Sequence, residues 1–131
     1  MSRENVELIR KANEIWNADL LNPPYEYLDP EIEWETRWPG LPRYFHGHEG
    51  VKEWVERALE PMRIQMDLID ARSLDEETVF AEYRARGQGR GSGIETEMAI
   101  FDLYSIRNGL VYRRRTFYTR EEALEAAGHS A

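Results

Sequence analysis

The chain has 131 residues, of which 41% are hydrophobic and 11% aromatic, and it carries a net charge of −8. This composition is that of a globular chain, and the length predicts one domain spanning residues 1–131. The excess of acidic residues argues against nucleic acid as a partner. The lack of cysteine excludes disulfides and thiolate chemistry. The polar start and the lack of a long apolar run predict a cytoplasmic protein with no membrane partner.

The first half of the chain predicts helices separated by proline-rich breaks. Val6, Ile9 and Trp16 recur at helical spacing, and the two prolines after Asn22 end that helix. We expect, in order, a helix over residues 2–20, a short turn over 25–28, a strand over 32–37, a loop over 38–42 and a second amphipathic helix that starts within 47–50 and carries Val51, Trp54, Val55, Ala58 and Leu59.

The second half of the chain predicts strands. Asp75 and its acidic neighbours supply one turn, and Asn108-Gly109 is a strong hairpin signal. We expect four strands over residues 64–71, 78–86, 94–106 and 110–118, and a closing helix over 121–127. Helices followed by an antiparallel meander predict an α+β fold, with a curved antiparallel sheet wrapped around the N-terminal helices.

Asp102 is an acidic residue in the middle of an otherwise apolar strand, MAIFDLYSI. Because side chains alternate along a strand, Asp102 shares a face with Ile100 and Tyr104. A carboxylate in such a place needs a partner, goes neutral, or faces a cavity that holds a ligand or water. Arg114 has the same parity on the next strand, so Asp102 is either a protonated acid in a pocket or half of a buried ion pair.

The stretches IRKANEIWNADL, YLDPEIEWE, YFHGHEGVKEWV and IRNGLVYRRRTFYTREEALEAAG resemble the SnoaL-like polyketide cyclase and ketosteroid isomerase-like group of the NTF2-like superfamily. The resemblance covers nearly the whole chain. It implies a cone-shaped barrel with an apolar pocket inside, and a homodimer formed through the outer sheet face, which carries Phe101 and Leu103. The cavity-facing strand positions would be Val79, Ala81, Tyr83, Ala85, Ile100, Asp102, Tyr104, Tyr112, Arg114, Thr116 and Tyr118.

The resemblance also implies roles for single residues. Asp102 falls where the isomerases carry a protonated acid that donates to an enolate oxygen, and Glu35 aligns with their general base. If Trp34 points inward, however, strand alternation turns Glu35 toward water. Two departures from the family patterns stand out: the isomerase tyrosine of the first helix is replaced near Trp16, and the cyclase aspartate of the last strand falls near Thr116.

These observations favour binding of a small apolar molecule, with cofactor-free proton transfer next to a carbonyl as the implied chemistry. The candidate catalytic residues are Asp102, Glu35 and His46. The candidate ligand-binding residues are Trp16, Trp34, Trp38, Trp54, Tyr83, Tyr104, Arg114, Thr116 and Tyr118. His46 and His48 lack a third metal ligand nearby, so we expect no metal. We expect no organic cofactor either, because a preorganised hydrogen-bond site can stabilise an enolate by itself. The alternative is a non-catalytic binding or dimerisation module.

Overall fold

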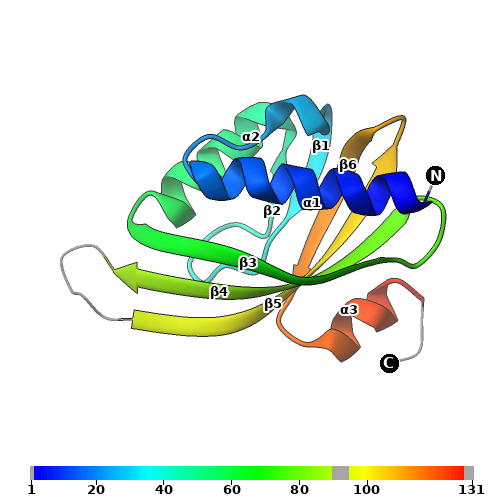
Figure 1. The fold of residues 1–131 in the computed structure, drawn as a ribbon. Coiled ribbons are helices and arrows are strands. Elements are labelled where there is room, and N and C mark those ends of the chain that lie inside the picture. The colour runs from blue at the N-terminus through cyan, green and yellow to red at the C-terminus, as the bar shows by residue number, and fades with distance from the viewer. Residues whose placement is uncertain (1, 90–94, 129–131) are drawn as a thin grey trace.

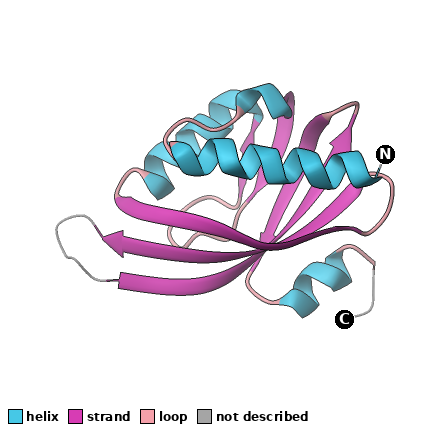
Figure 2. Cartoon of the chain, viewed as in Figure 1, coloured by secondary structure: helices cyan, strands magenta, loops and turns pink. Residues whose placement is uncertain are grey.

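The computed structural model describes residues 2–89 and 95–128, which form helices on both sides of one curved sheet (Figure 1 and Figure 2). The helical elements are α1 (Ser2–Ala18), the 3-10 turn η1 (Tyr25–Tyr27), α2 (Gly47–Trp54), the π-helical turn η2 (Val55–Leu59) and α3 (Arg120–Ala126). The strands are β1 (Leu28–Glu35), β2 (Tyr44–His46), β3 (Met62–Ser73), β4 (Thr78–Gly89), β5 (Glu95–Arg107) and β6 (Leu110–Phe117). The predicted start of the strand over residues 94–106, Ile94, lies outside the described residues.

The strands form one mixed sheet in the order β2-β1-β6-β5-β4-β3. β3 to β6 make the predicted antiparallel meander, whereas β1 pairs with β6 in parallel and β2 adds an antiparallel edge. The α+β class with a curved sheet around the N-terminal helices is thus confirmed. The prediction that the first strand begins at residue 32 is wrong, because β1 already starts at Leu28. It runs through Pro30, in a stretch where the β1–β6 register is interrupted and no amide donor is needed.

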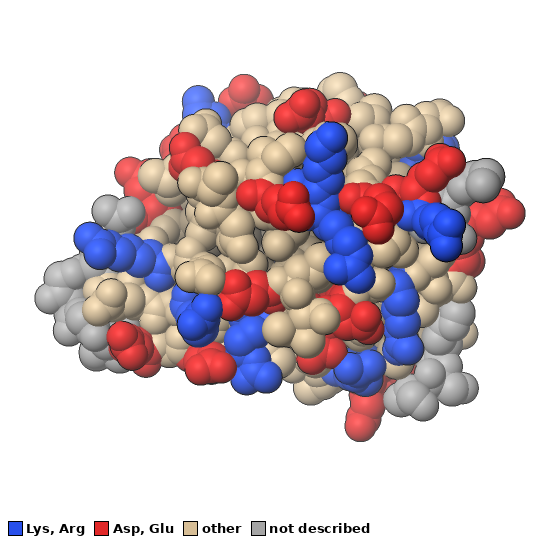
Figure 3. Space-filling view, in the orientation of Figure 1, with Lys and Arg blue, Asp and Glu red and all other residues tan. Residues whose placement is uncertain are grey.

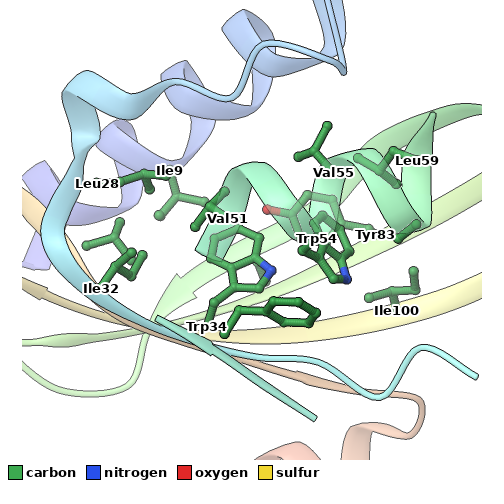
Figure 4. Packing of buried hydrophobic residues seen from close by; sticks show 14 of the residues in the cluster. Ile9, Leu28, Ile32, Trp34, Val51, Trp54, Val55, Leu59, Tyr83 and Ile100 are labelled. Carbon is green, nitrogen blue, oxygen red and sulfur yellow. The ribbon is translucent and has the colours of Figure 1, made fainter. Parts of the chain in front are cut away.

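The larger core lies between the concave sheet face and the helices α1 and α2. Strand alternation sends Val79, Ala81, Tyr83 and Ala85 of β4 to this face. Trp54 and Val51 of α2 point toward Trp34 of β1 across the same core (Figure 4). The side chain of Asn17 holds α1 against β3, donating to the carbonyl of Met66 at 2.6 Å and accepting from its amide at 3.1 Å.

A second apolar cluster lies on the opposite face, where α3 packs against β5 and β6 (Figure 1). Phe101 and Leu103, expected at a dimer interface, are 7% and 1% exposed in the single chain, because Ala123 and Leu124 of α3 pack in their cluster. Burial of these two residues therefore needs no partner chain. The homodimer stays a prediction.

The surface is strongly charged but mixed in sign. On the face seen in Figure 3, acidic and basic side chains are interspersed. The outer face of the meander carries cross-strand ion pairs, Arg84 with Glu97 at 3.1 Å and Arg86 with Asp67 at 2.7 Å. In the part of the chain that the structure describes, no helix is long and apolar enough to cross a membrane.

Candidate functional site

A cavity of about 50 Å³ lies inside the cone, between α1, the end of η2 and the concave face of β3 to β6. Its walls are mainly apolar, with polar groups from β5 and β6 on one side. Nine predicted site residues line it together: Asp102, Trp16, Trp38, Trp54, Tyr83, Tyr104, Arg114, Thr116 and Tyr118. Strand alternation explains this convergence, because Asp102 lies opposite Thr116, and Tyr104 lies opposite Arg114, in the β5–β6 register.

Asp102 is 1% exposed and accepts three hydrogen bonds. Its Oδ1 accepts from the Thr116 hydroxyl at 2.7 Å, and its Oδ2 accepts from the Tyr104 hydroxyl at 3.0 Å and from Nε of Arg114 at 3.3 Å. Nε of Arg114 and Oδ2 of Asp102, at 3.3 Å, form a buried salt bridge. Of the two alternatives predicted for Asp102, the structure thus has the buried ion pair with Arg114.

Arg114 is 4% exposed and is held in place by indole rings as well as by Asp102. Its guanidinium carbon lies 4.2 Å from the ring centre of Trp34 and 5.2 Å from that of Trp54, both within the range of cation–π attraction. Trp34 therefore contributes to the cavity wall indirectly, by packing against Arg114.

Three buried donors around Arg114 have no hydrogen-bond partner among the described residues: Nη1 of Arg114 and the indole Nε1 atoms of Trp34 and Trp54. An unmet buried donor is costly, and native structures contain few of them. In contrast, the Trp16 indole donates to the carbonyl of Leu20 at 2.9 Å. Two of these three residues, Arg114 and Trp54, also line the cavity.

Two tyrosine hydroxyls extend the network along the wall. The hydroxyls of Tyr83 and Tyr104 lie 2.7 Å apart, and because Tyr104 donates to Asp102, Tyr83 is the donor in this pair. Burial raises the pKa of both phenols, and the nearby Asp102 charge raises it further. Burial likewise raises the pKa of the Tyr118 phenol. All three side chains are therefore neutral at physiological pH.

The four tryptophans of the chain occupy much of the space inside the cone. Trp54 is the centre of the group, with ring centres 5.5 Å from Trp34, 6.1 Å from Trp38 and 6.3 Å from Trp16. Trp54 ends α2 where the helix widens into the π turn η2, a feature that often occurs at functional sites, and Leu59 at the end of this turn also lines the cavity. The aromatic packing keeps the cavity small.

Glu35 and His46 lie on the other face of the sheet and line a separate groove there. Trp34 points into the core, so its neighbour Glu35 points outward. Arg43 and Arg37 cover its carboxylate at 3.2 Å and 3.7 Å and leave Glu35 only 6% exposed. His46 contacts Glu31 at 2.9 Å on the surface. The structure therefore does not bring Glu35 or His46 together with Asp102.

Tyr112 does not take its expected place at the cavity. The β5–β6 register shifts between Ser105 and Ile106, so the alternation of Arg114 and Thr116 does not continue back to Tyr112, which instead donates to Glu77 at 3.0 Å outside the core. Several further lining residues were not predicted from the sequence, namely Asn13, Leu20, Thr36, Leu59, Ile64 and Met66. The alternation of Ile64 and Met66 along β3 is a signal that could have identified these two.

Within the described residues, no three His, Cys, Asp or Glu side chains lie close enough together to hold a metal ion. The chemistry that the cavity offers comes from hydrogen-bond donors and one carboxylate. Such a site can orient a polar group of a ligand, stabilise negative charge on an oxygen, or exchange a proton at Asp102.

Comparison with known proteins agrees with this architecture. The NTF2-like protein of unknown function from Burkholderia pseudomallei superposes with a TM-score of 0.77 at 15% identity over 92% of this chain and 95% of that one. A putative polyketide cyclase from Xanthomonas campestris pv. campestris gives a TM-score of 0.74 at 19% identity over 91% and 93%. A Catenulispora acidiphila protein with a ketosteroid isomerase-like fold, in complex with trimethylamine, gives 0.74 at 14% identity over 94% and 93%.

At these identities the structural likeness shows a shared fold and no shared activity. No protein with curated function is similar enough in sequence to be matched. The sequence profile of the SnoaL-like domain, however, matches residues 9–114, which include most of the cavity wall. The chain therefore belongs to the SnoaL-like domain family and has the NTF2-like α+β cone fold.

Proposed function

We propose that this protein binds a compact, mostly apolar molecule whose oxygen atom accepts hydrogen bonds inside the cone. The carrying observation is that two residues of the cavity wall, Arg114 and Trp54, each have a buried donor, Nη1 and Nε1, with no partner among the described residues. A ligand carbonyl oxygen has two lone pairs and can accept from both. The apolar walls then take the rest of the molecule, as in most small-molecule sites.

The charge of the site favours an uncharged acceptor. Asp102 already neutralises Arg114, so a ligand carboxylate would add a second buried anion near Asp102, and desolvating an unpaired ion costs several kcal/mol. A ketone adds no net charge. The volume adds a limit on size: about 50 Å³ is well below the roughly 300–1,000 Å³ of typical ligand pockets. A small ketone fits, whereas a ring system requires the tryptophans to move.

Proton transfer next to the bound carbonyl is a second candidate, favoured by the position of Asp102 in the cavity wall. A carbonyl oxygen held by Arg114 would share negative charge with a cationic donor as an enolate forms, and Asp102 would take the α-proton. The three hydrogen bonds to Asp102 oppose this role, because they already occupy both of its carboxylate oxygens.

Binding without catalysis is therefore the function that the geometry supports best. The Catenulispora neighbour was obtained in complex with trimethylamine, and the Xanthomonas neighbour is named a putative polyketide cyclase. Both names support a small-molecule role for this fold. The hypothesis of proton transfer by two residues needs a second carboxylate beside Asp102, and the described cavity wall contains none. The aromatic side chains that fill the cone also argue against this hypothesis.

The experiment compares two probes of equal carbon skeleton, 2-butanone and 2-butylamine, by ligand-observed NMR at neutral pH. We expect 2-butanone to bind, and the protonated amine, which only donates, not to bind. Trp54→Phe keeps an aromatic ring but removes the donor, and should weaken 2-butanone binding roughly two- to ten-fold. Trp16→Phe is the control, since the Trp16 indole already donates to Leu20. Equal binding of both probes would refute the proposal.

The same samples in D2O test catalysis. If Asp102 transfers protons, the α-hydrogens of 2-butanone exchange faster with the protein than without it, and Asp102→Asn removes the acceleration. Binding of 2-butanone with no faster exchange would leave the binding function and exclude the enzymatic one for this substrate class.

A further inference from the structure

We infer that residues 38–42 form a flap that opens and closes the cavity, and that Glu35 is the positioning residue at the base of this flap. The flap controls access to the cavity whatever molecule the cavity holds. The inference therefore rests on the cavity itself and not on the carbonyl ligand of the proposed function. It also gives Glu35, which lies away from Asp102, a role at the site.

The flap contributes one tryptophan to the cavity wall. Trp16 belongs to α1, Trp34 to β1 and Trp54 to α2, so backbone hydrogen bonds of helices and of the sheet hold these three residues. Trp38 lies in the loop between β1 and β2, where it is half-buried, packs edge-on against Trp54 and lines the cavity. Trp38 is therefore the tryptophan of the cavity wall that is free to move when a larger molecule enters.

The flap makes no hydrogen bond to the rest of the described chain. Its described hydrogen bond is internal, from the Leu41 amide to the Trp38 carbonyl at 3.2 Å. Pro39 and Gly40, the latter with a φ of 80°, occupy the two middle positions of this turn, which is the pattern of a type II turn. Trp38 and Leu41 attach the flap to the main core by apolar contacts. A segment held by so few contacts opens at a low cost in free energy.

The chain on both sides of the flap is anchored. Before the flap, the Arg37 carbonyl accepts from the Tyr118 hydroxyl at 3.0 Å, and Nε of Arg37 donates to the Thr116 carbonyl at 3.0 Å. After the flap, the Arg43 carbonyl accepts from the Thr36 amide at 2.8 Å. These hydrogen bonds confine the motion to residues 38–42.

Glu35 joins the two ends of the flap base. Its Oε2 lies 3.2 Å from Nη2 of Arg43 and 3.7 Å from Nη2 of Arg37, which are the residues directly after and directly before the flap. Without the charge of Glu35, the two guanidinium groups would repel each other across the base. The Glu35 carboxylate therefore favours the closed flap.

The test is hydrogen–deuterium exchange of the indole N–H groups in the ligand-free protein, followed by NMR at constant pH. Nε1 of Trp54 is buried and has no partner among the described residues, and its ring packs against Trp38, so we expect it to exchange when the flap opens. Nε1 of Trp34 is buried in the same way, but its ring packs against Trp16 and Trp54. Trp34 is therefore the internal reference for opening of the whole fold.

Glu35→Gln removes the charge and keeps the shape of the side chain. We expect it to accelerate exchange at Trp54 about two- to ten-fold and to leave exchange at Trp34 unchanged. Glu33→Gln is the matched control, because Glu33 lies on the same strand and pairs with Arg113 at 3.8 Å, outside the flap base. This control should leave both exchange rates unchanged.

Two results would overturn the inference. If Glu35→Gln accelerates exchange at Trp54 no more than Glu33→Gln does, Glu35 does not hold the flap. If Glu35→Gln accelerates exchange at Trp34 and Trp54 equally, the whole fold opens and not a flap. Because no ligand is present, these results do not depend on whether 2-butanone binds, so failure of the flap and failure of the proposed function are distinguishable.

Discussion

Removing the carboxylate of Asp102 should strongly destabilise the fold. Asp102 and Arg114 are 1% and 4% exposed, so Asp102→Ala leaves a guanidinium buried without its counter-charge. Breaking a buried pair in this way costs about 3–5 kcal/mol. Thr116 and Tyr104 also lose their acceptor, within the same penalty. Since domains are typically stable by about 5–15 kcal/mol, Asp102→Ala should remove a large part of the free energy of unfolding.

Urea unfolding followed by tryptophan fluorescence measures this effect, because Trp34 and Trp54 contact Arg114 directly. A double-mutant cycle with Arg114→Met isolates the pair. We expect Asp102→Ala/Arg114→Met to be more stable than Asp102→Ala alone, since removing both charges also removes the desolvation penalty. The buried ion pair is ruled out as the source of this stability if Asp102→Ala costs less than about 1 kcal/mol, or if the two single effects simply add.

Two further predictions concern stability. Because burial raises the pKa of Tyr83 above its ordinary value of 10.0, the unfolded chain loses this proton first, so the stabilisation is complete below about pH 10 and declines as the pH rises beyond it. In urea titrations from pH 9 upward, Tyr83→Phe should flatten the decline of the free energy of unfolding with pH. Tyr44→Phe, at a 65% exposed site, should not. If Tyr83→Phe declines as steeply as the unmodified protein, the pH dependence does not come from Tyr83. Asn17→Ala removes both hydrogen bonds to Met66 and should cost about 1–3 kcal/mol in the same assay, whereas Asn22→Ala, at an exposed loop bond, should cost only a few tenths; equal losses would show that Asn17 does not hold α1 to β3.

Much of the cavity could be predicted from local alternation. Period two along β5 puts Ile100, Asp102 and Tyr104 on one face, and period two along β6 keeps Arg114, Thr116 and Tyr118 on one face. These relations depend on neighbours in sequence, so they hold without knowledge of the rest of the fold.

The parts that failed depend on contacts between distant segments. The three-residue strand β2 is too short for a periodic signal, and the parallel pairing of β1 with β6 joins residues far apart in the chain. The register shift near Ile106 displaced Tyr112, which no pattern in the sequence marks. Glu35 was expected to face either the pocket or water; instead it faces outward and is covered by arginines, among them Arg37 and Arg43.

Binding of a carbonyl oxygen inside the cone can be followed directly in the NMR signal of each indole N–H during titration with 2-butanone. Individual Trp→Phe variants assign the four signals. We predict that the Trp54 signal moves, because its buried Nε1 gains an acceptor, while the Trp16 signal, whose donor is used by Leu20, stays in place. A shift at Trp16 without one at Trp54, or no shift at any tryptophan, would contradict the binding of a carbonyl oxygen at this site.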